Sequence, residues 1–136
     1  MSGSVDAFFY GLFMDESVLK DAGVSPRHGR KARLDGFALL IGQRATLVRS
    51  AGATAWGMVY TLAPDELDRL YRAPGLAHYR PEAVEVALEN RAIIAARAYV
   101  LPQPPAESER NPEYAERLKA VLTRLGFPAD YIAQIG

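Results

Sequence analysis

The hydrophobic and polar positions of the chain predict short strands over its first two thirds and a long helix near its end. Residues 5–11 are almost wholly apolar and end at a glycine, which predicts a short strand buried on both faces. Strands avoid interior glycine, so Gly11 marks a bend or a place where something approaches the backbone closely. Beside the Tyr10 hydroxyl, such a strand end predicts the floor of a ligand site, although a simple strand-to-loop turn gives the same pattern.

Further strand candidates follow at short spacing, separated by turns that contain glycine, which is typical of antiparallel neighbours. They cover residues 32–41, with a break at Asp35-Gly36, then 45–50 and 55–62. Residues 78–88 alternate between apolar and polar side chains, and residues 93–101 return after the Asn90-Arg91 turn, so this pair predicts a hairpin.

Helices are predicted at four places. A brief one covers residues 16–22, and a second begins at Pro64, where a proline loses no helical hydrogen bond. Asn111-Pro112 supplies a cap and a first residue for a long amphipathic helix that Gly126 ends, and residues 127–135 form a short final helix. The order of elements predicts an α+β fold with a small mixed, strongly curved sheet or barrel and helices at its rim, as a single domain over residues 1–136.

Composition narrows the function classes. Hydrophobic residues make up 49% of the 136 residues, and 16 basic side chains balance 16 acidic ones. A chain of this size buries a sizeable core, and without net charge no field favours nucleic acid or an anionic membrane. No apolar run reaches the roughly 20 residues that span a bilayer, and no export signal opens the chain, so we expect a cytoplasmic protein.

Two chemistries are disfavoured by the residues available. The chain has no cysteine, which excludes disulfides, thiolate metal sites and a cysteine nucleophile. Its two histidines, His28 and His78, lie in separate predicted elements without a carboxylate cluster at ligand spacing, so no metal site and no cofactor are predicted. The basic stretch over residues 25–31 has no glycine-rich phosphate cradle beside it and is interpreted as a solvated loop.

Five segments, taken in order, resemble the gamma-glutamylcyclotransferase superfamily over almost the whole chain. The family opens with a strand that ends in Tyr-Gly-Ser-Asn-Leu or Tyr-Gly-Thr-Leu, and its middle carries Trp-Gly-x-Val-Tyr-x-Leu before a helix. The matching segments here are Phe9-Tyr10-Gly11-Leu12-Phe13, Trp56-Gly57-Met58-Val59-Tyr60-Thr61-Leu62, Tyr79-Arg80-Pro81-Glu82-Ala83-Val84-Glu85-Val86, Asn111-Pro112-Glu113-Tyr114 and Gly126-Phe127-Pro128-Ala129-Asp130-Tyr131-Ile132. Each match is weak alone, but the order and spacing are hard to obtain by accident.

The resemblance implies a barrel-like fold with a pocket for a gamma-glutamyl group and, as activity, release of 5-oxoproline from a gamma-glutamyl amine or peptide. That reaction needs a folded substrate, donors for the oxyanion and a base for the ammonium proton. The resemblance places Tyr10, Gly11, Leu12, Phe13, Tyr79 and Tyr114 in the substrate pocket. Tyr114 also falls on the apolar stripe of its helix, so a core role is an alternative.

The family's base is the Glu of a Leu-Asp-x-x-Glu-Gly motif after the central helix. With the motif aligned on Leu70-Tyr71-Arg72-Ala73-Pro74-Gly75, Pro74 fills the Glu position, and proline has no ionisable group. Glu82 shares the strand parity of Val84 and Val86 and is the candidate for a relocated base; an edge residue reaching solvent is the alternative. His78 is closer in sequence but is expected at the surface.

Two functions therefore remain open at this stage. One is a cyclotransferase-like enzyme with a relocated base. The other is a small-molecule-binding or interaction module that kept the fold and lost its acid–base residue, with a degenerate active site. In both, the expected partner is a small gamma-glutamyl ligand, with no nucleic acid and no membrane. The sequence leaves the oligomeric state open, a homodimer included.

Overall fold

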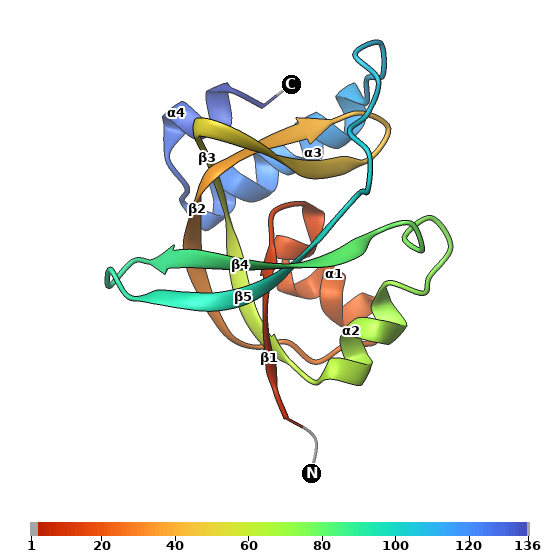
Figure 1. The fold of residues 1–136 in the computed structure, drawn as a ribbon, viewed down its shortest axis with the longest axis vertical. Coiled ribbons are helices and arrows are strands. Elements are labelled where there is room, and N and C mark those ends of the chain that lie inside the picture. Colours follow the sequence, from red (N-terminus) through yellow and green to blue (C-terminus); the bar gives the residue numbers. More distant parts are fainter. Residues whose placement is uncertain (1–2, 136) are drawn as a thin grey trace.

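The five strands form a closed barrel, and the helices lie on its outside (Figure 1). The computed structural model describes residues 3–135. The strands are β1 (Val5–Phe9), β2 (Arg27–Ile41), β3 (Ala45–Leu62), β4 (Arg80–Leu88) and β5 (Ile93–Val100), paired in the order β1-β3-β2-β4-β5. Four pairings are antiparallel, and the parallel pairing of β1 with β5, through Ala7 and Arg97, closes the barrel. The predicted α+β barrel class is confirmed.

Strands β2 and β3 form one long curved hairpin rather than the three short strands that the sequence predicts. Gly36 and Gly52 have φ of 85° and 82°, and the pairing register shifts between Asp35 and Phe37. A glycine at positive φ bends a strand without ending it, so the predicted break at residues 35–36 is a bulge. Strand β2 also begins at Arg27, within the segment expected to be a loop.

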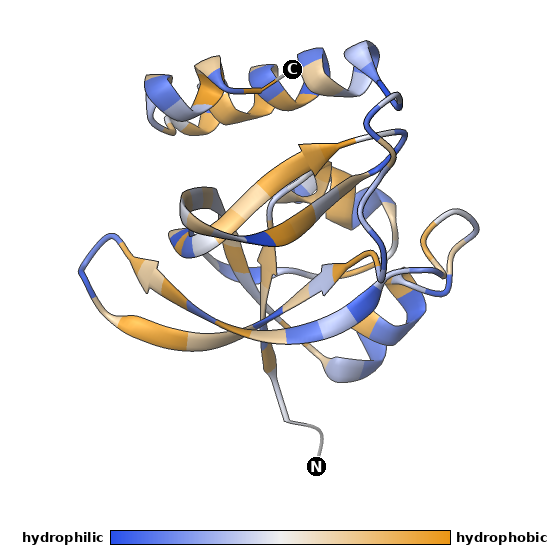
Figure 2. Cartoon of the chain, turned by 45° about the horizontal axis from the view of Figure 1, so that its top comes forward, coloured by the Kyte–Doolittle hydropathy of each residue, from blue (hydrophilic) through white to orange (hydrophobic). Residues whose placement is uncertain are grey.

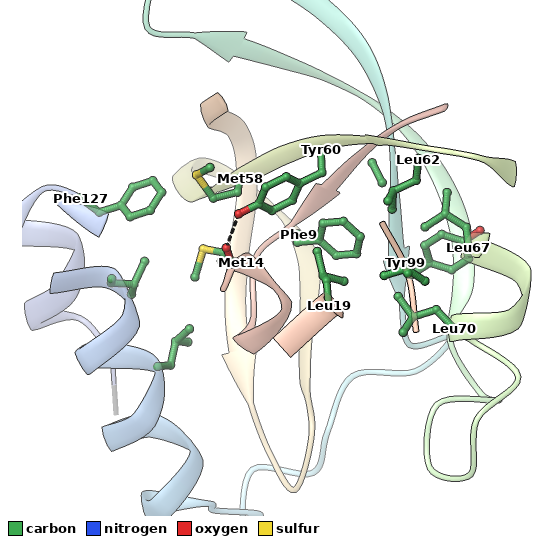
Figure 3. Packing of buried hydrophobic residues seen from close by; sticks show 14 of the residues in the cluster. Phe9, Met14, Leu19, Met58, Tyr60, Leu62, Leu67, Leu70, Tyr99 and Phe127 are labelled. Atoms are coloured by element: carbon green, nitrogen blue, oxygen red, sulfur yellow. Dashed lines mark hydrogen bonds between the residues drawn. The ribbon is translucent and has the colours of Figure 1, made fainter. Parts of the chain in front are cut away.

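Two hydrophobic clusters hold the fold together. The cluster inside the barrel contains Phe8, Leu34 and Val86, and the second lies between the barrel and the helices. In the second, Phe9 of β1 packs with Tyr60, which donates a hydrogen bond of 2.7 Å to the Met14 carbonyl (Figure 3). Alternate residues of β1 therefore serve the two clusters, because successive side chains of a strand point to opposite faces.

Four of the helices lie at the predicted positions, whereas the short helix η1 (Leu12–Met14) was not predicted. The four are α1 (Glu16–Asp21), α2 (Pro64–Leu70), α3 (Pro112–Leu125) and α4 (Ala129–Ala133). Asn111 caps α3 by accepting a hydrogen bond from the Tyr114 N–H, and Gly126 ends the helix at φ 83°. The apolar face of α3 turns towards the barrel and its polar face outwards (Figure 2). No helix in residues 3–135 is long and apolar enough to cross a membrane.

Candidate functional site

A cavity of about 310 Å³ lies at the end of β1, where the chain bends into η1. All six residues that the resemblance places in a substrate pocket line it, although they come from the β1–η1 bend, the segment before β4, and α3. They are Tyr10, Gly11, Leu12, Phe13, Tyr79 and Tyr114. The fold therefore brings together a set of residues that is dispersed along more than a hundred positions of the chain.

The corner of the cavity is built on close contact between Gly11 and Tyr114. A Cβ atom at Gly11 would overlap the Tyr114 hydroxyl, so the absence of a side chain lets α3 reach the bend. The Leu12 N–H donates a hydrogen bond of 3.3 Å to the same hydroxyl. Tyr114 is half-buried and contacts both hydrophobic clusters, so it belongs to the cavity wall and to the core at once.

One wall of the cavity is aromatic. Tyr71 directly follows α2 and stacks on Tyr99 of β5, with ring centroids 3.9 Å apart and an interplanar angle of 10°. Phe13 and Tyr71 meet edge to face with ring centroids 6.2 Å apart, and the tilted Tyr79 ring lies 5.9 Å from the Tyr71 ring. Stacked and edge-to-face aromatic pairs stabilise a fold beyond the effect of their buried area, so these contacts hold the rings of this wall in place.

The tyrosine hydroxyls near the cavity are donors rather than bases. Tyr10 donates to the Tyr99 carbonyl at 2.6 Å, and Tyr79 donates to the Ala45 carbonyl at 2.5 Å. Burial raises the pKa of Tyr79 to about 12, and burial also raises the pKa values of Tyr10, Tyr71 and Tyr114. All four phenols therefore stay protonated near neutral pH.

Arg44 is the one cationic side chain in the cavity lining of the described residues. It is exposed and lies in the tight turn between β2 and β3. Its guanidinium lies next to Gly75. Its positive charge lowers the pKa of Tyr79 and so offsets part of the increase that burial causes. None of the six ion pairs in residues 3–135 includes Arg44. The cavity mouth thus carries a positive charge that no ion pair within residues 3–135 neutralises.

The turn that carries Arg44 is held by the segment before α3. The Glu109 carboxylate accepts hydrogen bonds from the N–H groups of Gln43 (3.1 Å) and Ala106 (2.9 Å), and the Asn111 side-chain amide donates to the Gln43 carbonyl at 3.0 Å. Both backbone groups of Gln43 are therefore engaged. A Cβ atom at Gly42 would overlap Pro105 and Glu109, which shows how closely the two segments approach.

The structure corrects the expectation that Glu82 faces the cavity. Glu82 does not line it; its carboxylate lies 3.4 Å from Arg49, whose guanidinium covers the Phe37 ring at 4.9 Å. The strand parity was interpreted correctly, because Glu82 pairs with the fully buried Ala98 of the inner cluster. Parity does not fix the position along the strand, however, and Glu82 lies near the beginning of β4, where its side chain reaches Arg49 instead.

Pro74 and His78 also lie outside the cavity lining, and both are exposed. Tyr71, which the alignment on Leu70 assigned to the motif's Asp, lines the cavity instead. Read three residues earlier, the Leu-Asp-x-x-Glu motif meets Leu67-Asp68-Arg69-Leu70-Tyr71, which retains both Leu and Asp. This literal Leu-Asp pair was the sequence signal for Tyr71. Arg44 had no comparable signal, because its place depends on a contact between distant segments.

The described residues contain no group of three or more His, Asp or Glu side chains that could hold a metal ion. The cavity lining within residues 3–135 likewise contains no carboxylate and no imidazole. What remains is an apolar and aromatic space with phenol donors and a guanidinium at its mouth. Such a lining binds small molecules through shape and a few polar contacts.

A closed five-stranded barrel with peripheral helices and an aromatic-lined cavity at the end of its first strand defines a small α+β ligand-pocket fold. The family model described as gamma-glutamyl cyclotransferase, AIG2-like, matches residues 7–118. The chain therefore belongs to the AIG2-like gamma-glutamyl cyclotransferase family.

Solved structures share this fold at low sequence identity. A structure named gamma-glutamyl cyclotransferase superposes with a TM-score of 0.81 at 22% identity, covering 98% of this chain and 89% of that one. An uncharacterized human protein gives 0.79 at 23% identity, covering 98% and 88%. An Arabidopsis thaliana protein gives 0.68 at 20% identity, covering 92% and 95%. None of the curated protein sequences compared with this chain matches it.

Proposed function

We propose that this chain binds a small molecule in the cavity beside Gly11 and does not release 5-oxoproline from gamma-glutamyl compounds. The observation that carries the proposal is the chemistry of the lining: among the described residues, its ionisable side chains are four tyrosines and one arginine. The cyclisation needs a group that takes a proton from the substrate's ammonium. Protonated phenols and a guanidinium cannot take it near neutral pH.

The position of the missing acid supports the same proposal. Aligned on Leu67-Asp68, the family motif puts Tyr71 where the Glu is expected, and Tyr71 lines the cavity and stacks on Tyr99. A tyrosine there fills space and offers a donor, whereas the Glu would accept a proton. General-base catalysis contributes roughly 10² to 10⁴ in rate, so its loss removes most of the chemical step.

Gamma-glutamyl compounds are the first ligands to test, because the chain belongs to a family named for them. The purified protein is incubated with a gamma-glutamyl amine, a gamma-glutamyl amino acid and a gamma-glutamyl peptide, and both thermal stability and 5-oxoproline are measured. We expect a rise in melting temperature with at least one compound and no 5-oxoproline above the buffer control. A ligand at a hundred times its Kd stabilises the folded state by about 2.7 kcal/mol.

A cavity-filling variant assigns the binding to this site. Leu76→Trp adds bulk at a half-buried lining position, and Ile93→Trp adds the same bulk at a side chain that is 61% exposed and lies outside the cavity. We expect the first variant to abolish the ligand-dependent shift and the second to retain it. Release of 5-oxoproline by the unaltered protein contradicts the non-catalytic part of the proposal, and a shift that survives Leu76→Trp contradicts the site.

A further inference from the structure

The polar groups around the cavity are unequally divided between donors and acceptors. Arg44 brings a charged donor without a counterion within residues 3–135, and the hydroxyl of Tyr114 accepts from Leu12 and keeps its own proton to donate. Tyr71 adds a further hydroxyl to the lining. Of the other polar side chains of the lining, Tyr10 and Tyr79 donate to backbone carbonyls, and Gln43 is uncharged and exposed.

Three backbone acceptors at the same corner are already engaged. The Gly11 carbonyl accepts from the Met14 N–H at 3.0 Å, and the Leu12 carbonyl accepts from the Asp15 N–H at 3.1 Å. The Ala45 carbonyl accepts from the Tyr79 hydroxyl. An ammonium group that left water for this cavity would meet no carboxylate in the described lining, and burying an unpaired charge is costly.

The body of a ligand would meet hydrocarbon. The cavity is lined by Tyr71, which stacks on Tyr99, and by the apolar side chains of Phe9, Leu12, Phe13, Val18 and Leu76. Burial of an apolar or aromatic group against these side chains is favourable in proportion to the area removed from water.

The backbone of the turn that carries Arg44 is held in place before any ligand arrives. Glu109 and Asn111 fix the N–H and the carbonyl of the preceding residue, Gln43, so the turn loses little freedom when a ligand binds. A guanidinium recognises a carboxylate by two parallel hydrogen bonds, a geometry that a fixed backbone favours.

We infer that the ligand of this cavity is a carboxylate with an uncharged, mainly apolar body, held at the mouth by Arg44, and that an α-ammonium group on the ligand opposes binding. The inference rests on the proposed binding function and narrows it: within the gamma-glutamyl class, it favours compounds whose α-nitrogen is acylated or part of a lactam.

Three matched probes test the inference by calorimetry with the full chain. They are 3-phenylpropanoate, phenylalanine, which adds the α-ammonium group, and 3-phenylpropanamide, which removes the negative charge. We expect 3-phenylpropanoate to bind about tenfold more tightly than either of the other two, since hydrogen bonds to charged groups are the stronger ones. Arg44→Gln should remove this preference for the carboxylate over the amide, whereas Arg69→Gln, an exposed position on α2 outside the cavity, should preserve it.

The possible results distinguish this inference from the proposed function. Equal or tighter binding of phenylalanine, or an unchanged preference in Arg44→Gln, overturns the inference. Binding of gamma-glutamyl compounds with no binding of any of the three probes overturns this inference alone and leaves the proposed function standing. No binding of probes or gamma-glutamyl compounds overturns both. Circular dichroism of each variant establishes that the substitutions leave the fold intact.

Discussion

The Tyr114 hydroxyl occupies the space in which a side chain at Gly11 would begin. The backbone at Gly11 has φ −112° and ψ −152°, an extended conformation that any residue adopts. Glycine is therefore required here by the approach of α3 and not by backbone strain. This contact, together with the hydrogen bond from Leu12, joins two segments that lie 102 residues apart.

Gly11→Ala should destabilise the protein by about 1–3 kcal/mol, because its new methyl group overlaps the Tyr114 hydroxyl in a packed region. The double variant Gly11→Ala/Tyr114→Phe should recover part of that loss, since the rest of the ring lies farther away. Urea unfolding of the two single variants and the double variant measures the coupling between the sites. Additive effects of the two substitutions would show that the overlap is not the cause.

A carboxylate placed at residue 71 should return part of the missing chemistry. Because Tyr71 lines the cavity and Pro74 does not, Tyr71→Glu is expected to form 5-oxoproline from a gamma-glutamyl amine at roughly 10² times the rate of the unaltered protein. Pro74→Glu is the matched control and should remain at the background rate. Activity in Pro74→Glu alone would instead support the alignment that begins at Leu70.

Glu109→Gln should weaken binding of 3-phenylpropanoate with little effect on overall stability. The carboxylate uses one oxygen for Gln43 and the other for Ala106, whereas an amide offers a single acceptor. These two hydrogen bonds also lower the pKa of Glu109. Calorimetry compares this variant with Glu107→Gln, which changes an exposed side chain of the same segment. Equal affinities in both variants would mean that the clamp on the Arg44 turn does not matter for binding.

Asp15 should make stability depend on pH in the acid range. Hydrogen bonds from Arg124, at 2.7 Å, and from Ser17 hold the pKa of Asp15 below its ordinary value of 3.8. A lowered pKa means that the stabilisation is present above pH 3.8 and is lost as the pH falls through the lower value of the folded state. Asp15→Asn should therefore unfold with a flatter pH profile than the unaltered protein.

Urea titrations between about pH 2.5 and about pH 7 check the Asp15 prediction. The lower limit lies about one unit below the ordinary pKa of 3.8, and the upper limit lies well above it. Asp21→Asn at the other end of α1 is the control, because Asp21 forms no ion pair within the described residues. A profile for Asp15→Asn as steep as that of the control would contradict the assigned role of Arg124.

Glu82→Ala should leave ligand binding unchanged and cost at most about 1 kcal/mol of stability. Its partner Arg49 is largely exposed, and exposed ion pairs contribute little. Thermal shifts with and without ligand test both statements. A loss of binding would restore Glu82 as a functional residue, contrary to its position in the structure.

The sequence predicted the elements well wherever a local pattern carries the information. Asn111, Pro112 and Gly126 bound α3 as expected, and the β4–β5 hairpin turns at Asn90-Arg91, where Arg91 has φ of 70°. The length of β2 and β3 was underestimated, because a glycine that bends a strand and a glycine that ends one give the same local pattern.

The site was predictable only in part, for a different reason. Tyr10, Gly11 and Tyr114 belong to segments with a recognisable order of residues, and the fold places them together. Predicting Tyr71 as a site residue required the correct alignment of a weakly retained motif. Predicting Arg44 required knowing that the β2–β3 turn contacts the segment before α3. Contacts between distant segments depend on the closed sheet, which pairing patterns in the sequence do not specify.

The closure of the sheet has a consequence for how this protein acquires a ligand. Because β1 is held between β3 and β5, and the bend after it meets α3, the binding corner does not exist until residues from both ends of the chain have docked. A ligand that recognises this corner would therefore bind only the fully folded chain. Its binding would stabilise the docking of β1 and of α3 together.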